Sequence, residues 1–213
     1  MSTLIQKLHP ALYPGRHLAL AGNRQPLLSR QGMWDSGSAL HCAAMALAML
    51  GKLSDPVDVR GYASGPVAHF WDRAWSHYLH GLMPSELVSF VWELDTGVRP
   101  IQAEDSPNEL PRFCARELSA GWPVIVWVVN RRTDERHAAL VAGIEEQDAI
   151  LKALLLLDPA GAVPELAACN ARLELGKSHA LHVTTEASVR ARLDGAVSIR
   201  RLREDDATGD GCA

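Results

Sequence analysis

The 213-residue sequence lacks any apolar segment long enough to cross a lipid bilayer. Its longest uninterrupted apolar run, Cys42 to Leu50, has nine residues, whereas about 20 are needed to span the hydrocarbon core. The N-terminal residues include Lys7 but no compact apolar core followed by a small-residue cleavage site, so no signal peptide is predicted. We therefore expect no membrane span.

Clusters of basic residues and paired cysteines are also missing. The net charge is −4 and no run of Lys or Arg occurs, so we expect neither a nucleic-acid nor a lipid-surface partner. The four cysteines, at positions 42, 114, 169 and 212, form no CxxC motif and no paired spacing. This usage favours reduced thiols and a cytoplasmic location. Basic residues are mostly Arg and Ala is abundant, which indicates a bacterial source.

Hydrophobic periodicity predicts one domain over residues 1–203, followed by an acidic, Gly-containing tail over 204–213 that we expect to be disordered. Apolar residues at helical spacing and Gly or Pro boundaries predict helices over 38–50, 67–82, 85–94, 108–120 and 186–193. Runs rich in β-branched residues predict strands over 17–21, 123–129, 138–144, 150–157, 181–183 and 197–201. Helices first and an antiparallel sheet after them predict an α+β fold.

Ser38 stands where the most informative helix begins, and two interpretations of it are open. Ser is among the best residues for capping a helix, which needs no catalysis. The start of a helix is also where a nucleophilic thiol is best placed, because the helix terminus favours an anion. Such a thiol needs a His to pair with it and a group that orients the His.

Two residues from the predicted sheet are candidates for those partners. His137 opens one predicted strand and Asp158 closes the next, so the two side chains meet if the strands are adjacent and antiparallel. The alternative interpretations without catalysis are that His137 is a structural residue at the start of a strand and that Asp158 belongs to an Asp-Pro turn. Gln31, seven residues before Ser38, is a candidate donor to an oxyanion.

Two other interpretations of this region are weaker. Cys42 as the nucleophile is disfavoured because, one turn into the helix, it would face the core. A zinc site from His41, Cys42 and His137 is disfavoured because adjacent helical residues point in different directions. No metal, nucleotide or other cofactor is therefore expected.

The stretch from Gln31 to Gly51 resembles the papain-like peptidases of the C39 type, the double-glycine leader peptidases. Their nucleophile region reads roughly Cys-Gly-x-x-Cys-x-x-Met and ends at a Gly, and these places fall without a gap on Ser38, Cys42, Met45 and Gly51. Further similar pieces are residues 121–125 (GWPVI), 137–141 (HAALV), 158–160 (DPA) and 185–197.

The resemblance implies a papain-like α+β fold, with an N-terminal helical part that carries the nucleophile and packs on a C-terminal antiparallel sheet. It also implies that His137 is the base, Asp158 the orienting acid and Gln31 the oxyanion-hole donor. The chain departs from the pattern in having Ala39 after the nucleophile and Ser at the nucleophile itself.

Ser36 is a rival for the nucleophile position, because Asp35-Ser36-Gly37 resembles the family's Asp-Cys-Gly. Ser38 is preferred, because a two-residue shift along the helix would rotate its buried face by roughly 200°.

The Ser leaves three explanations open, since an imidazole suited to a thiol activates a hydroxyl poorly. The chain is a Cys-to-Ser inactive form of a peptidase, a natural binding module for a leader peptide or protein partner, or a working serine hydrolase. The expected function is hydrolysis of a peptide bond, after small residues such as Gly-Gly, with a peptide or protein as substrate. A transferase or deamidase on the same fold is an alternative, because the acyl-enzyme chemistry is shared.

Overall fold

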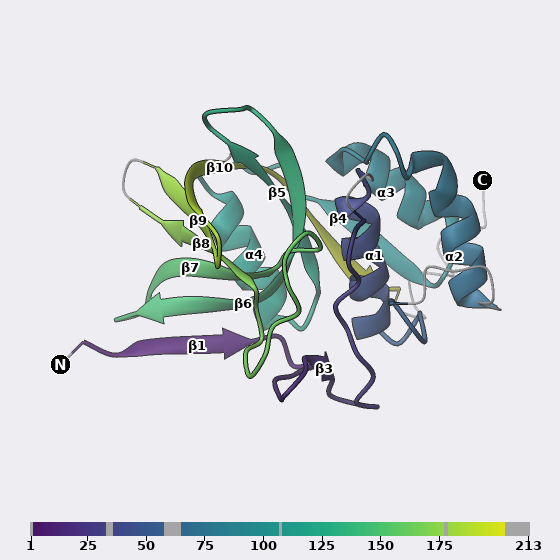
Figure 1. Ribbon diagram of the computed structural model, residues 1–213, viewed down its shortest axis with the longest axis horizontal. Helices are drawn as coiled ribbons and strands as arrows, with labels where there is room; N and C mark the ends of the chain where they lie inside the picture. Colours follow the sequence, from purple (N-terminus) through teal and green to yellow (C-terminus); the bar gives the residue numbers. More distant parts are fainter. Residues whose placement is uncertain (1, 33–35, 58–64, 107, 177–178, 203–213) are drawn as a thin grey trace, which may run out of the picture.

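A computed structural model describes residues 2–32, 36–57, 65–106, 108–176 and 179–202 (Figure 1). The predicted tail over 204–213 and Asp35, which precedes the rival Ser36, lie outside the described residues. Within the described part of the chain, no helix is long and apolar enough to span a membrane.

Four α-helices lie close to where the periodicity predicts them. Their bounds are Ser38–Met49 (α1), Pro66–Ala74 (α2), Pro84–Glu93 (α3) and Leu110–Ser119 (α4), and a 3₁₀ turn, Trp75–His77, follows α2. Every residue of α1 is buried, which matches its apolar character all round and makes it the central helix. Gly51 ends the helix region with a φ of 70°, as predicted, because only Gly adopts that conformation without strain.

The strands form an antiparallel sheet that closes on itself. The neighbour order β6-β5-β10-β9-β8-β7 returns to β6, which makes a six-stranded barrel, with β1 added beside β6 and β4 beside β10. A separate ribbon of two short strands, β2 and β3, precedes α1. The bounds are Leu4–Leu8 (β1), Leu12–Tyr13 (β2), Ala19–Leu20 (β3), Val98–Gln102 (β4), Val124–Asn130 (β5), Arg136–Gln147 (β6), Ile150–Leu157 (β7), Ala171–Leu175 (β8), Ala180–Thr184 (β9) and Ser188–Arg201 (β10).

The predicted fold class, a papain-like α+β arrangement in which an N-terminal helical part packs on a C-terminal antiparallel sheet, is wrong. The strands hold more of the described residues than the helices do, and β6 pairs with both β5 and β7, so the sheet closes into the barrel. The physical reason is long-range pairing: β8 and β9 continue the sheet from β7 to β10, and a closed sheet has no unpaired edges.

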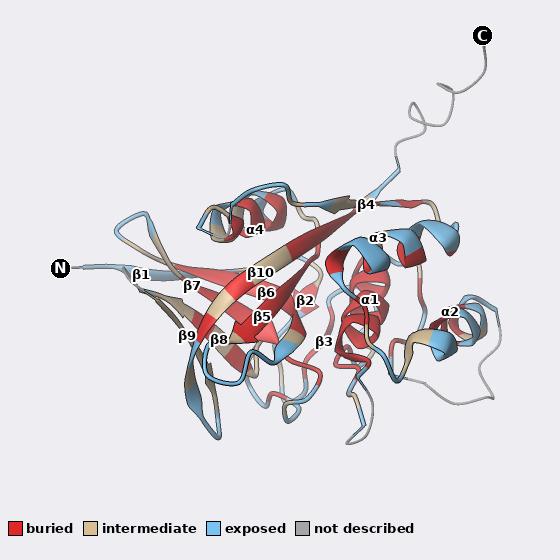
Figure 2. Cartoon of the chain, turned by 90° about the horizontal axis from the view of Figure 1, so that it is seen from above, coloured by how far each residue is buried: buried red, intermediate tan, exposed pale blue. Residues whose placement is uncertain are grey.

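The strand β5 is buried on both faces, which explains its continuous apolar sequence. Ile125 and Trp127 of β5 belong to a core cluster with α1, whereas Val126 and Val128 belong to a second cluster with α4. Figure 2 shows α4 and α1 over different parts of the sheet, with buried strands between them. A strand covered on both faces needs no polar alternation, so runs such as residues 124–129 read as strands directly.

Several local expectations fail. A helix was predicted over 186–193, but residues 188–193 belong to β10, where Arg190 and Arg192 alternate with Ala191 and Leu193 at the period of a strand. The helix predicted over 67–82 ends at Ala74, and Trp75 is 74% exposed rather than part of a packed stripe. The strands β1, β2, β4 and β8 were not expected at all.

Candidate catalytic site

His137 and Asp158 meet as the strand order predicts. Leu140 of β6 pairs with Leu157 of β7, so Asp158, one residue beyond β7, falls beside the start of β6. His137 Nε2 lies 2.6 Å from Asp158 Oδ1. Because an ionised carboxylate only accepts hydrogen bonds, Nε2 carries the proton of this bond, and in the neutral tautomer Nδ1 is the acceptor nitrogen.

Asp158 is buried and its position is fixed by several hydrogen bonds. Its Oδ1 also accepts the Ala160 N–H, at 2.8 Å. Asn170 holds its backbone from both sides: the Asp158 N–H donates to Asn170 Oδ1 at 2.7 Å, and Asn170 Nδ2 donates to the Asp158 carbonyl at 2.9 Å. No sequence signal singled out Asn170, which acts twelve residues away through an irregular loop.

The carboxyl of Asp158 is held in its ionised form. Burial raises its pKa, but the hydrogen bond and charge of His137 and the Ala160 N–H outweigh burial and leave the pKa below the ordinary value. The group therefore stays an acceptor for His137 at neutral pH.

Ser38 is the first residue of α1, and its hydroxyl contacts β6 rather than its own helix. The cap residue is Gly37, with no side-chain cap hydrogen bond, so the interpretation of Ser38 as a helix cap is wrong. Instead Ser38 Oγ accepts the Ala138 N–H at 3.1 Å. That bond joins the hydroxyl to the residue after His137 and leaves the Ser38 O–H proton to be donated elsewhere.

Ser36, the rival position, lies apart from this group. It is exposed in the segment before α1, and its backbone N–H donates to the Tyr78 carbonyl at 3.1 Å. Among the described residues, no side-chain hydrogen bond joins either Ser36 or Ser38 to His137 or Asp158, but Ser38 Oγ bonds to the residue after His137. This contact favours Ser38 over Ser36.

Gln31 lies beside the end of β7. Its backbone N–H donates to the Pro159 carbonyl at 3.1 Å, which places the residue next to Asp158. Its side-chain Oε1 is buried and has no hydrogen-bond partner within the described ranges. No hydrogen bond in the described part of the chain links this amide to Ser38, so its oxyanion role stays a prediction.

His182, on β9, is a residue of this site that the sequence did not reveal. It lines a pocket of about 190 Å³ together with His137 and Asp158, and its Nε2 is buried without a partner in the described segments. Burial lowers its pKa; the Asp158 charge opposes this and the His137 charge adds to it. The ring is therefore neutral near pH 7. Nothing in the sequence could link it to His137, because the link depends on β7, β8 and β9 pairing in that order.

Cys42 and His41, the residues of the weaker interpretations, both lie in the core. Cys42 is fully buried, and burial, together with the nearby Asp158 charge, raises the pKa of its thiol, so it does not act as a nucleophile. His41 is buried with its Nδ1 at 2.8 Å from Ser29 Oγ. Among the described residues, no group of three or more His, Cys, Asp and Glu side chains is arranged to hold a metal ion.

Compared with known proteins, the chain matches no family model and no curated sequence.

Proposed function

We propose that this chain carries a peptidase-type acyl-transfer site in which Ser38 occupies the nucleophile position, His137 is the base and Asp158 orients the base. The proposal rests above all on the 2.6 Å bond between His137 Nε2 and Asp158 Oδ1, which leaves Nδ1 as the proton acceptor. The resemblance of Ser38, Cys42, Met45 and Gly51 to the double-glycine leader peptidases supports a peptide substrate cut after small residues.

With a Cys at position 38, the reaction follows from the groups present. The thiol gives its proton to His137, the thiolate attacks the scissile carbonyl, and His137 returns the proton to the leaving amine. Water then hydrolyses the thioester. The start of α1 and the Ala138 N–H, which now donates to Ser38 Oγ, would both stabilise the thiolate. Gln31 would donate to the oxyanion.

With Ser at this position the chain holds the substrate and turns it over poorly, because the hydroxyl remains protonated near neutral pH. The binding module is the second candidate, and one observation favours it. Ser38 is only 9% exposed, and its Oγ already accepts a hydrogen bond from the Ala138 N–H of β6. A cytoplasmic location and a peptide or protein partner complete the proposal, on the basis of the unpaired cysteine spacing.

The decisive experiment is Ser38→Cys followed by alkylation with iodoacetamide at pH 6, read by mass spectrometry. A fall of about 2 in the thiol pKa raises the thiolate fraction at pH 6 about 100-fold, and the lower nucleophilicity of the weaker base takes back about tenfold. We therefore expect alkylation about tenfold faster than for free cysteine. A rate no faster than free cysteine would reject the peptidase-type site.

The other thiols set the background for this test. Cys42 and Cys114 are fully buried with raised pKa values, so they stay unmodified in the folded protein. Cys169 is half-buried and is replaced by Ser, together with Cys212. In this background His137→Ala should return the rate to that of free cysteine, whereas Ser36→Cys should show no enhancement.

A fluorophosphonate probe on the unaltered chain separates the remaining alternatives. Modification at Ser38 that His137→Ala abolishes would show a working serine hydrolase. Absence of modification, combined with a reactive Ser38→Cys variant, would identify the chain as a peptidase inactivated by the Ser.

A further inference from the structure

Three arginines lie together where the β5–β6 hairpin meets the start of β10. Arg131, Arg132 and Arg190, called the arginine cluster below, line a cavity of about 580 Å³ with Asn130, Ser188 and Val189. The backbone fixes the arrangement, because the Arg131 N–H donates to the Arg190 carbonyl at 2.9 Å and the Arg132 N–H donates to Asn130 Oδ1 at 2.9 Å.

Among the described residues, the neighbouring arginines have acidic partners, whereas those of the cluster have none. Arg136 pairs with Asp194, and Arg192 pairs with Asp194 and Asp134. Another acidic side chain of this hairpin, Glu135, accepts a hydrogen bond from the Thr133 hydroxyl. Among the described residues, no carboxylate lies within ion-pair distance of the three cluster arginines. A chain of net charge −4 thus keeps three uncompensated cations at one place.

The cluster borders the candidate catalytic pocket. Asn130 and Val189 line both the 580 Å³ cavity and the 190 Å³ pocket of His137 and Asp158. A peptide seated with its scissile bond at that pocket would therefore pass the arginines within a few residues, since an extended chain advances about 3.3 Å per residue.

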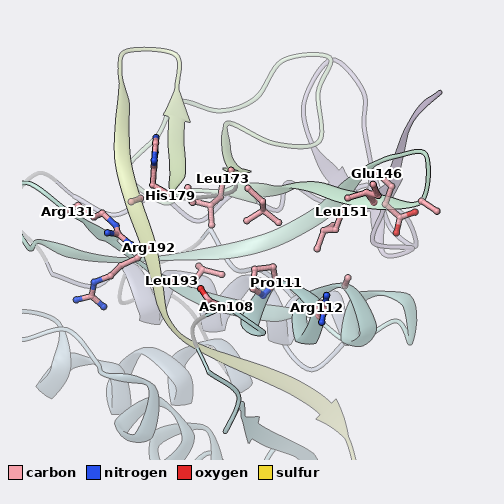
Figure 3. Close-up of a pocket in the computed structure, with 17 residues that line it drawn as sticks. Asn108, Pro111, Arg112, Arg131, Glu146, Leu151, Leu173, His179, Arg192 and Leu193 are labelled. Atoms are coloured by element: carbon pink, nitrogen blue, oxygen red, sulfur yellow. The ribbon is translucent and has the colours of Figure 1, made fainter. Parts of the chain in front are cut away.

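A larger cavity also borders the cluster. Its volume is about 930 Å³, and Arg131 lines it as well as the 580 Å³ cavity. Figure 3 shows Arg131 and Arg192 at one end of this space, with Leu173 and Leu193 between them and Leu151, and with the helix α4 along one side. The arginine cluster thus borders both the pocket of His137 and Asp158 and this larger cavity, which polar side chains and leucines line together.

We propose that the arginine cluster is an anion-binding subsite that takes Asp or Glu side chains of the peptide next to the scissile bond. This inference rests on the catalytic pocket proposed above and adds the substrate class, an acidic peptide. The guanidinium group suits carboxylates because its planar N–H donors match the two carboxylate oxygens.

A nucleic acid fits the cluster less well than an acidic peptide. Proteins that bind duplex nucleic acid through the backbone commonly neutralise about 6–10 phosphates, and three arginines supply fewer contacts. None of the six residues that line the cavity is aromatic, so no stacking platform for bases is present there.

The test measures binding on the unaltered Ser38 chain by fluorescence anisotropy, so it does not depend on turnover. The probes are three decapeptides with a central Gly-Gly that carry three Glu, three Gln or three Lys on its N-terminal side, and a second set with these residues on its C-terminal side. We expect the Glu peptide of one set to bind about fivefold to twentyfold more tightly than its Gln counterpart at 50 mM salt, as three part-exposed ion pairs allow. The preference should shrink at 300 mM salt, because salt screens exposed charges.

Two triple variants make the test specific. Replacing the arginine cluster by Gln should reduce the preference for Glu over Gln to less than twofold. The control removes the same charge from three exposed arginines elsewhere, Arg16, Arg73 and Arg99. The control should keep the preference, and both variants should keep the melting temperature, because all six side chains are exposed.

Three outcomes would overturn the inference. The first is equal binding of the Glu and Gln peptides in both sets, and the second is an equal loss of preference in the two triple variants. The third is displacement of the Glu peptide, dependent on the arginine cluster, by a 20-nucleotide single strand or by phosphatidylserine vesicles at equal charge concentration. The proposed function fails separately, by an unreactive Ser38→Cys variant. If that variant is unreactive while the preference for Glu depends on the cluster, the subsite stands in a binding module.

Discussion

Replacement of Asp158 by Asn isolates the charge at the centre of the candidate site. Both hydrogen bonds of the Asp158 side chain, from His137 Nε2 and from the Ala160 N–H, end on the same oxygen, Oδ1. An Asn can present its carbonyl oxygen at that place, so Asp158→Asn keeps both acceptor contacts and removes only the charge. Asp158→Ala removes the acceptor as well.

The magnitude follows from the burial of the pair. The Asp158 side chain is 8% exposed and that of His137 is 28% exposed, so solvent screens the interaction only in part. A hydrogen bond to a charged group contributes about 1.5–3 kcal/mol and a neutral one about 0.5–1.5 kcal/mol. We expect Asp158→Asn to lower the free energy of unfolding by about 1–2 kcal/mol at pH 7. Asp158→Ala should lower it by about 2–3 kcal/mol, a loss that stays limited because water can accept hydrogen bonds from the two donors left without an acceptor.

The stability that ionised Asp158 contributes depends on pH. The folded pKa of Asp158 is lowered from 3.8, so its contribution to stability is complete well above pH 4 and is lost as the pH falls through the folded pKa. Asn does not titrate. The stability gap between the original chain and Asp158→Asn should therefore be equal at pH 7 and pH 5 and narrower at pH 3.

The assay is thermal unfolding followed by tryptophan fluorescence, to which Trp127 in the core contributes. At pH 7 the Asp158→Asn variant should melt roughly 3–6 °C lower, as expected for a chain of this size. A gap that is absent at pH 7, or that stays constant down to pH 3, would refute the argument that a charged Asp158 holds His137.

Three further predictions concern the surroundings of the site. Gly143→Ala should cost about 1–3 kcal/mol and speed hydrogen exchange in β1, because the added Cβ would lie 2.7 Å from the Lys7 carbonyl oxygen; unchanged exchange in β1 would contradict this. Glu117→Ala should lower the free energy of unfolding in urea by about 2–3 kcal/mol, because the change removes the buried partner that two 2.8 Å hydrogen bonds join to Arg200. A loss below about 1 kcal/mol would show that water solvates the 37% exposed Arg200 side chain when Glu117 is absent. His182 should titrate below 6.5 in an NMR pH series, because burial lowers its pKa, and a midpoint at or above 6.5 would count against its burial in the pocket.

The start of α1 and the order of the two central strands were predictable from the sequence. The helix begins at Ser38 and β7 spans Ile150–Leu157 as expected, because apolar periodicity and Gly or Pro boundaries are local signals. The contact between His137 and Asp158 followed from those local signals alone, since consecutive β-strands joined by a short turn pair antiparallel.

The part of the site that was missed comes from contacts with no local signal. His182 reaches Asp158 through two intervening strand pairings, and Asn170 reaches it through a loop. The start of β10 was misread as a helix, because Val189 and Leu193, four residues apart after the Glu-Ala-Ser start, also fit helical spacing. The arginine cluster exists only because β10 returns beside the β5–β6 hairpin.

The sequence by itself thus determined the individual helices and central strands, whose signals lie within a few residues of each other. Whether Ser38 caps its helix or faces the sheet was decided by the tertiary structure, because Gly37 takes the cap position and Ala138 supplies the hydrogen bond. The closure of the sheet into a barrel was decided in the same way. It depends on β6 pairing on both edges, and the pairing of strands far apart in the chain is a property of the whole fold.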